Sequence, residues 1–333
     1  MSIEMLDLPE GISVVVPVFN SEGTLAQLAV LLEEVLCSCT RRFELILVND
    51  CSRDTSWKVI CDLSDQFDWV RGINLMRNYG QHNALLCGIR AAAYDTIVTI
   101  DDDLQNPPNE IPRLLSVLQQ GYDVVYGYPE KQQHGLLRDL ASEITKLVLQ
   151  KTMGAQTARR VSAFRVFRTE LREAFSRYQS PLVSIDVLLT WATSRFSALQ
   201  VRHEPRKIGS SNYTIGKLIT HALNMMTGFT IFPLQIASMV GFAFTAFGGC
   251  LLLYVLGRYL IVGTSVPGFP FLASVVAIFA GVQLFALGVI GEYIARQHMR
   301  TMEKPTYTVR SVVGNRADPP SSVAAEPGIR AKG

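Results

Sequence analysis

The sequence lacks the motifs that mark several common classes of enzyme. It has no GxGxxG turn after its first expected strand and no GxxxxGK[ST] motif, which disfavours a dinucleotide-dependent dehydrogenase and a P-loop NTPase. Its five histidines form no HExxH pattern and its six cysteines form no CxxC pair, so neither a zinc site nor a disulfide framework is indicated. We therefore expect all six cysteines to be structural.

Charge of either sign is also scarce. Only 18% of the 333 residues are charged, and 31 basic against 29 acidic side chains leave no excess for a nucleic-acid backbone. The opening MSIEMLDLPEG includes acidic residues and no apolar run, so we expect no secretory signal peptide and a cytosolic N-terminal part. Hydrophobic residues make up 48% of the chain, which is too many for a disordered protein and suggests a membrane portion.

Two uncharged apolar runs near the C-terminus account for much of this excess. They cover Phe232 to Leu256 and Phe269 to Ile290, and each reaches the ~20 residues that a helix needs to cross a bilayer. A Pro-Gly turn lies in the link between them, so the pair is predicted to be a helical hairpin. The alternative is two buried helices of a soluble domain, but helices of this length normally keep a polar stripe.

Basic residues flank the outer ends of the hairpin, and they predict its orientation. The positive-inside rule places both chain termini in the cytoplasm and the link outside, although Arg258 weakens the bias slightly. The flanking residues are Arg206, Lys207 and Lys217 before the hairpin, and Arg296, Arg300 and Lys304 after it.

Between residues 11 and 130, apolar strand-like runs alternate with helical spacing. The expected strands cover residues 12–18, 43–48, 70–75, 96–100 and 123–127, and the expected helices 25–36, 56–67, 81–92 and 110–119. Continuous apolar strands separated by helices are typical of a mostly parallel sheet covered on both faces. Such sheets bind ligands beyond the carboxyl ends of their strands, so the polar residues after each run are the candidates for function.

Three consecutive aspartates follow the fourth strand. Asp101 and Asp103, two positions apart in extended backbone, should project to one side, where carboxylate oxygens suit Mg²⁺ or Mn²⁺ bridging a diphosphate. Packed carboxylates repel one another, and a divalent cation relieves that repulsion. An acidic turn at the start of a helix is the alternative interpretation.

These blocks together resemble a known family. VVVPVFNSE, LVNDCSRD, RNYGQHNALLCGI and TIDDDLQNPP, followed by two membrane helices and GEYIARQ, are similar to the polyprenyl-phosphate glycosyltransferases of glycosyltransferase family 2. The resemblance extends from about residue 11 to 310. It implies a GT-A nucleotide-sugar domain that passes a sugar, with inversion, from a nucleotide diphosphate to a lipid phosphate. It also implies a homo-oligomer, expected to be a tetramer.

The resemblance assigns roles to the strand-end residues. The positions matching the nucleotide site, with the polar residues that follow the third and fourth strands, are Pro17, Phe19, Asn20, Glu22, Asp50, Arg77, Asn78 and Asp102. Asp101 and Asp103 match the family's catalytic DxD pair and, with Gln105, form the expected metal site. Asp102 stands where the family usually has alanine, and Cys51 stands where it usually has glycine. The acidic residue that often precedes Phe-Arg is missing before Phe164.

The missing acid is chemically tolerable. A lipid monophosphate, with its second pKa near ~6, is largely dianionic at neutral pH and can attack the sugar without a general base. Cations that hold this phosphate are therefore expected instead of a base, and Arg206 is assigned a catalytic role among them. The expected acceptor residues are Arg138, Arg165, Arg206, Ser211 and Lys217.

The region ahead of the hairpin has helical spacing. Apolar residues of 214–229 fall on one helical face, which predicts a helix lying on the cytoplasmic leaflet, or alternatively one packed on the catalytic domain. The tail from Gly314 is rich in proline, serine, alanine and glycine and is expected to be disordered.

The expected organisation follows from these observations. It has a cytosolic GT-A domain over residues 1–212, an interfacial helix over 213–230, transmembrane helices over 231–260 and 269–292, a periplasmic link over 261–268, a cytosolic basic segment over 293–313, and a disordered tail over 314–333. The expected partners are a nucleotide diphosphate sugar, with a UDP-sugar first, undecaprenyl phosphate and the bacterial inner membrane, and the expected role is cell-envelope glycosylation. A polysaccharide-extending synthase and a non-catalytic membrane scaffold remain alternatives.

Overall fold

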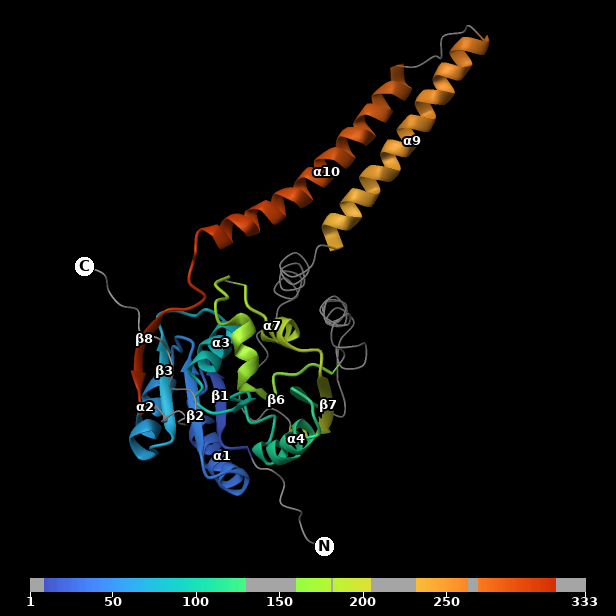
Figure 1. Ribbon diagram of the computed structural model, residues 1–333. Coiled ribbons are helices and arrows are strands. Elements are labelled where there is room, and N and C mark those ends of the chain that lie inside the picture. The colour runs from blue at the N-terminus through green and yellow to red at the C-terminus, as the bar shows by residue number, and fades with distance from the viewer. Residues whose placement is uncertain (1–8, 130–159, 181, 205–231, 263–268, 316–333) are drawn as a thin grey trace, which may run out of the picture. The chain divides into compact units, whose positions relative to one another are not determined.

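A computed structural model describes residues 9–129, 160–180, 182–204, 232–262 and 269–315 (Figure 1). The chain forms two compact units. One contains the β-sheet and includes the segment after residue 303, and the other contains the two long C-terminal helices. The expected helix over 213–230 and most of the link over 261–268 fall outside the described residues.

The first unit is built on an eight-stranded mixed sheet in the order β7-β5-β6-β4-β1-β2-β3-β8. β1 pairs in parallel with β2 and β4, β2 with β3, and β5 with β7, whereas β6 and β8 run antiparallel to their neighbours. The strands are β1 (Ile12–Val18), β2 (Phe43–Asn49), β3 (Val70–Leu75), β4 (Thr96–Thr99), β5 (Val124–Pro129), β6 (Arg165–Arg168), β7 (Phe196–Val201) and β8 (Val309–Val313).

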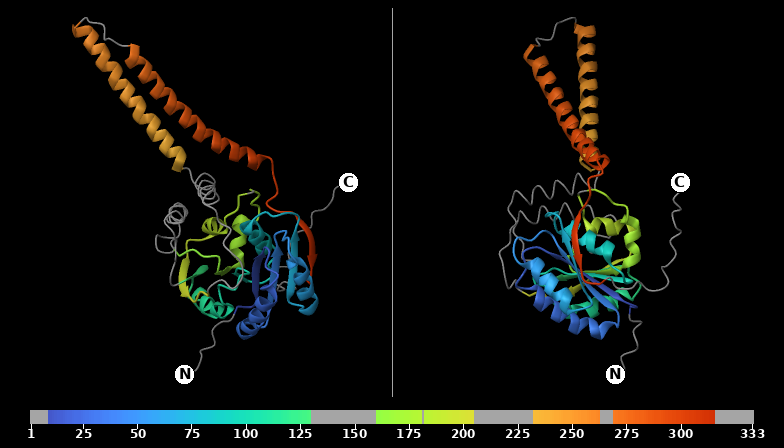
Figure 2. Two further views of the ribbon diagram at one scale, coloured as in Figure 1. Left: turned by 180° about the vertical axis from the view of Figure 1, so that it is seen from behind. Right: turned by 90° about the vertical axis from the view of Figure 1, so that its left-hand side faces the viewer.

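Helices cover both faces of this sheet, as continuous apolar strands require (Figures 1 and 2). Every residue of β1 is buried. The helical segments of the unit are α1 (Leu25–Cys39), α2 (Ser56–Gln66), α3 (Gln81–Ala91), η1 (Pro108–Glu110), α4 (Ile111–Leu118), η2 (Thr169–Phe175) and α7 (Ile185–Ala192). The expected strands and helices between residues 11 and 130 are confirmed to within two residues at their ends, except that α1 continues three residues beyond its expected end.

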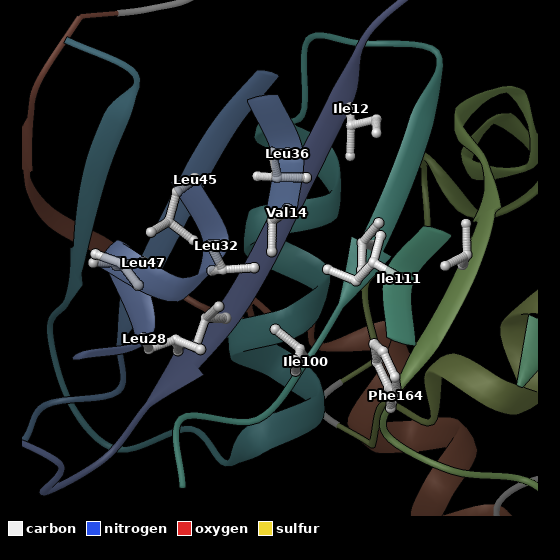
Figure 3. Packing of buried hydrophobic residues seen from close by; sticks show 14 of the residues in the cluster. Ile12, Val14, Leu28, Leu32, Leu36, Leu45, Leu47, Ile100, Ile111 and Phe164 are labelled. Atoms are coloured by element: carbon white, nitrogen blue, oxygen red, sulfur yellow. The ribbon is translucent and has the colours of Figure 1, made fainter. Parts of the chain in front are cut away.

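The main core lies between α1 and the central strands. Leu28, Leu32 and Leu36 of α1, which share one helix face, are fully buried and lie beside Val14 of β1 and the leucines of β2 (Figure 3). On the other face, α3 approaches β1 closely because Gly88 has no side chain. A Cβ at that position would lie 2.3 Å from Cγ1 of Val15.

The last strand extends the sheet unit beyond the expected domain over residues 1–212. Within the segment over 293–313, which is predicted to be basic and cytosolic, α10 continues to Thr301 and β8 then pairs with β3 at the edge of the sheet (Figure 2). Gly72 of β3 makes room for this strand, since a Cβ there would lie 2.7 Å from Cγ2 of Val313. The sheet unit therefore does not end at residue 212.

The second unit contains the predicted hairpin helices, α9 (Phe232–Val262) and α10 (Phe269–Thr301). Both contain stretches long and apolar enough to cross a membrane, Phe232–Arg258 with mean hydropathy 2.0 and Ile278–Thr301 with mean hydropathy 1.7. The rings of Phe244 and Phe279 meet edge to face, with centroids 6.0 Å apart. Gly248 allows this approach, because a Cβ there would lie 2.7 Å from Cζ of Phe279.

Candidate active site

Loops that follow four neighbouring strands meet at one edge of the sheet. β4, β1, β2 and β3 are adjacent and parallel, so their carboxyl ends point the same way. Most of the residues predicted to bind the donor lie in the loops after these strands. This is the position where open α/β sheets bind ligands.

The loops after β1 and β2 are joined by hydrogen bonds. The Asn20 side chain accepts from the backbone N–H of Arg53 at 2.8 Å, and the Asn20 N–H donates to Oγ of Ser52 at 3.0 Å. Oε2 of Glu22 accepts from both the N–H and the hydroxyl of Thr55, at 2.8 and 2.6 Å. Asn20 and Glu22, both predicted donor residues, thus shape the site through protein contacts.

Asp50 connects the second loop to the third. Its carboxylate is 3% exposed and accepts from the backbone N–H groups of Tyr79 and Gly80, at 2.7 and 2.8 Å. Burial raises the pKa of Asp50, and the two backbone donors act in the opposite direction. In the same loop, the Arg77 guanidinium lies 4.6 Å from the centre of the Tyr79 ring.

The remaining donor residues differ in exposure. Phe19 is 42% exposed, which suits a ring that stacks on a base, and Asn78 is also exposed. Pro17 is buried within β1, opposite Val48. Phe19 and Asn78 can therefore meet a ligand with their side chains, whereas Pro17 shapes the end of the strand.

The three aspartates after β4 have different partners. Oδ1 of Asp101 accepts from Nε2 of Gln81, in the first turn of α3, at 2.7 Å. Oδ1 of Asp103 accepts from the backbone N–H of Gln105 at 3.1 Å. Asp102 instead accepts from residues of the β1 loop, and burial raises its pKa. No group of three or more acidic, histidine or cysteine side chains that could hold a metal converges within the described ranges, so the assignment of Asp101 and Asp103 to a cation stays a prediction.

Left-handed backbone occurs in three of these loops. Asn20, Cys51 and Leu104 have φ values of 55°, 57° and 60°. Cys51 occupies the position where the resemblance predicts glycine, so the chain keeps the turn without the residue best suited to it. Such conformations cost on the order of 1–2 kcal/mol for residues with a Cβ, and they are concentrated at functional sites.

Four of the predicted acceptor residues, Arg138, Arg206, Ser211 and Lys217, lie outside the described residues. The chain just ahead of Arg206 does contact the aspartate loop. The N–H of Glu204 donates to the carbonyl of Gln105 at 2.8 Å, and Nδ1 of His203 lies 3.4 Å from Oδ1 of Asn106.

Arg165 corrects the prediction that it binds the acceptor phosphate. It is 1% exposed, donates from Nε to Oγ1 of Thr99 at 3.0 Å, and forms an ion pair with Asp186. Asp186 also accepts from the Tyr126 hydroxyl at 3.1 Å. A guanidinium enclosed by these partners supports β4 from within the domain and does not meet a lipid phosphate.

Sequence reasoning missed three residues that shape the site. Ser21 and Gln81 contact Asp102 and Asp101, and both stand in the polar stretches after strands, where they could have been found. Asp186, the partner of Arg165, had no local signal because it lies in the first turn of α7, far along the chain from the motif blocks.

Comparison with known proteins identifies the family of the chain. The model of the family described as glycosyl transferase family 2 matches residues 13–176. Two curated relatives, both undecaprenyl-phosphate 4-deoxy-4-formamido-L-arabinose transferases, are 34% identical to the chain. The protein from Pectobacterium atrosepticum aligns over 93% of this chain and 95% of its own length, and that from Photorhabdus laumondii over 95% and 97%.

Among solved structures, glucosyl-3-phosphoglycerate synthase from Mycobacterium tuberculosis is similar over 66% of this chain and 78% of its own, with 19% identity and a TM-score of 0.45. The sequence relatives span nearly the full chain, including the hairpin. The chain therefore belongs to glycosyltransferase family 2 and, within it, to the polyprenyl-phosphate glycosyltransferases, so that its α/β unit is of the expected GT-A class.

Proposed function

We propose that this enzyme transfers a sugar from a nucleotide diphosphate sugar to undecaprenyl phosphate on the cytoplasmic leaflet. A UDP-sugar is the first candidate for the donor. The main support is the meeting of the loops after β1, β2, β3 and β4 around Asp101 and Asp103. An oxygen of the lipid phosphate attacks C1 of the sugar from the side opposite the nucleotide. The bond from C1 to the nucleotide diphosphate breaks, and the sugar inverts.

The residues present fit a divalent cation. Asp101 and Asp103 are half-buried carboxylates of one loop, and hard oxygen ligands of this kind suit Mg²⁺ or Mn²⁺. Gln81 and the Gln105 N–H each hold one of these carboxylates in place. A bound cation would neutralise the charge that develops on the departing diphosphate. We propose Asp101 and Asp103 as its ligands, with Gln105 nearby.

On the acceptor side, no general base is required. The lipid phosphate is already a nucleophile, with a second pKa of ~6, so the protein has to hold it in line with C1. We assign this task to Arg138, Arg206, Ser211 and Lys217. The contacts of Glu204 and His203 with the aspartate loop support the placement of Arg206, which follows them by two and three residues.

The topology of the sheet supports the proposed orientation. β7 precedes the hairpin and β8 follows it, yet both belong to one sheet. Strands of one sheet lie on one side of a membrane, so the chain between them crosses an even number of times. Together with the flanking basic residues, this favours two spans with both chain ends in the cytoplasm.

The sugar is the least constrained part of the proposal. The named relatives transfer 4-deoxy-4-formamido-L-arabinose, so UDP-linked amino- and formamidopentoses belong in a donor panel beside UDP-, GDP- and dTDP-hexoses.

We also propose a homo-oligomer, which mass photometry of the detergent-purified protein would test.

One assay tests the function. Purified full-length protein should transfer labelled sugar from a nucleotide donor to undecaprenyl phosphate in detergent, and only with Mg²⁺ or Mn²⁺ present. Asp103→Ala should lose at least ~100-fold in kcat because charge stabilisation at the leaving group is lost. Asp65→Ala, which removes an exposed carboxylate of α2, is the matched control and should retain activity.

Other outcomes would contradict the proposal. Equal turnover by wild type and Asp103→Ala would exclude the metal site. No transfer with any donor would favour a scaffold, and extension of a glycan would favour a polysaccharide synthase. Arg206→Ala should lose acceptor turnover and keep nucleotide binding, and a loss of nucleotide binding would instead exclude its assignment to the acceptor.

A further inference from the structure

The carboxylate of Asp102 connects two loops of the proposed donor site. Oδ2 accepts from the backbone N–H of Phe19 at 3.1 Å and from the hydroxyl of Ser21 at 2.5 Å. Phe19 and Ser21 belong to the loop after β1, and Asp102 belongs to the loop after the adjacent strand β4. The bonds link residues more than 80 positions apart in the sequence.

The loop after β2 and the first residue of α2 also hold the β1 loop. The N–H of Ser21 donates to Oγ of Ser56 at 2.9 Å, and Asn20 bonds to Ser52 and to the N–H of Arg53. The β1 loop is therefore held by two anchors, the β2 loop with Ser56 and the carboxylate of Asp102. The exposed ring of Phe19 is carried by the segment that these anchors hold.

The carboxylate of Asp102 has different hydrogen-bond partners from those of Asp101 and Asp103. Asp101 bonds to a side chain of α3, and Asp103 bonds to the backbone of its own loop. Asp102 directs its oxygen toward the β1 loop, which separates it from the pair assigned to the cation.

We propose that Asp102 is a positioning residue, which sets the distance between the loop that carries Phe19 and the loop that carries Asp101 and Asp103. This inference rests on the proposed function, because those loops are taken to hold the base and the diphosphate of one donor. Fixing the spacing in advance lowers the ordering cost of binding. Loss of the link should therefore weaken donor binding more than it slows the chemical step.

The two hydrogen bonds end on one oxygen, which allows a sharp test. Asparagine can place its single carbonyl oxygen where Oδ2 lies and accept both bonds, whereas alanine accepts neither. In full-length enzyme, Asp102→Ala should raise the KM for the nucleotide sugar on the order of tenfold with a smaller change in kcat. Asp102→Asn should show a clearly smaller rise. If asparagine were as damaging as alanine, a role of the charge itself, as in metal binding, would replace the positioning role.

A second measurement needs no substrate and so separates this inference from the proposed function. Hydrogen exchange of the ligand-free, full-length protein in detergent should be faster at the Phe19 to Ser21 amides in Asp102→Ala than in wild type or Asp102→Asn. Unchanged exchange in Asp102→Ala would overturn the proposal even if the enzyme were active. Faster exchange in a protein that transfers no sugar would support the link and contradict the transferase function.

Ser21→Ala provides an independent check through the partner residue. If Ser21 and Asp102 act through one contact, the Ser21→Ala change should accelerate Phe19 exchange in wild type and have little further effect in Asp102→Ala. Fully additive effects would show that the two residues act separately and would overturn the proposal.

Discussion

Two kinds of residue in this protein occupy positions that are unfavourable by themselves. Cys51 has left-handed backbone in the loop after β2, and Arg165 places a charge in the interior. Each is held by its surroundings, Cys51 by the neighbouring strand-end loops and Arg165 by Asp186 and Thr99. Substitutions at these two positions should show how much the left-handed backbone and the buried charge each change the free energy of unfolding of the domain.

Replacing Cys51 by glycine should stabilise the protein modestly. Relief of the left-handed strain, on the order of 1–2 kcal/mol, outweighs the extra freedom of glycine in the unfolded chain, about 0.5–1 kcal/mol. Thermal unfolding in detergent should show a rise of a few degrees for Cys51→Gly. Cys51→Ala keeps the strain and removes the thiol, so it should not be more stable than wild type. A rise in both variants would indicate that the thiol, and not the backbone, is responsible.

Breaking the buried ion pair should be strongly destabilising. Arg165→Met leaves the Asp186 carboxylate without its cation and should reduce the free energy of unfolding by about 3–5 kcal/mol. The double variant Arg165→Met/Asp186→Leu should lose less, because no uncompensated charge remains. Arg195→Met removes an exposed cation from Asp123, which keeps Arg168 and the Thr193 hydroxyl as partners, so it should cost less than the change at Arg165. A similar small loss at Arg165 would mean that the pair is open to water.

At the scale of elements, β8 completes the edge of the sheet beside β3. The N–H of Met76 donates to the carbonyl of Thr308 at 2.9 Å, and Arg310 donates to the carbonyl of Met76 at 3.2 Å. Met76 directly precedes Arg77 and the loop that Asp50 holds. Behind this segment, Tyr307 lies near Arg90 and Cys87 of α3, and burial raises the pKa of the Cys87 thiol to about 12.

Removal of β8 should therefore destabilise the domain. A chain that ends after Lys304 would expose the backbone of β3 and lose the contacts of Tyr307, so we expect a lower unfolding temperature and aggregation through the open edge. A chain that ends after residue 315 keeps β8 and is the matched control, with an unfolding temperature close to that of wild type. Equal stability of the two truncated chains would show that β8 does not hold the sheet.

At the scale of the whole molecule, two long apolar helices are inserted in the sequence between two strands of one sheet. The chain leaves the sheet after β7, forms α9 and α10, and returns to the sheet as β8. This connectivity requires β7 and β8 to lie in the same compartment. The proposed membrane insertion of the two helices is therefore compatible only with an even number of crossings, whatever their orientation.

Cysteine labelling should reveal this topology. In intact spheroplasts, an impermeant maleimide should label a cysteine placed in the link at residue 265 but not the exposed Cys37 of α1. After permeabilisation, Cys37 should react, whereas Cys87 should stay unreactive until the protein unfolds, because it is buried and its thiol pKa is about 12. Labelling of Cys37 in intact spheroplasts would contradict the proposed orientation and indicate the opposite one.

Much of the architecture could be predicted from the sequence, because the signals involved are local. Apolar runs such as Ile12–Val18 predict a buried strand, and the run in α9 predicts a long apolar helix. Because the strands are parallel, the residues that follow them lie at one edge of the sheet. Asp101, Asp103 and the loops predicted to bind the donor were identified as candidates in this way. The family blocks added roles that local patterns alone would not supply.

Only the tertiary structure decided how those loops are connected and which charges are buried. Asp102 meets Ser21 across 81 residues, Arg165 meets Thr99 across 66, and Arg310 meets Met76 across 234. Such partners leave no periodic trace in the chain, since each depends on the register of strands formed far apart in sequence. For that reason the burial of Arg165 and the pairing of β8 with β3 were not predicted, while the strands between residues 11 and 130 were recognised from their own residues.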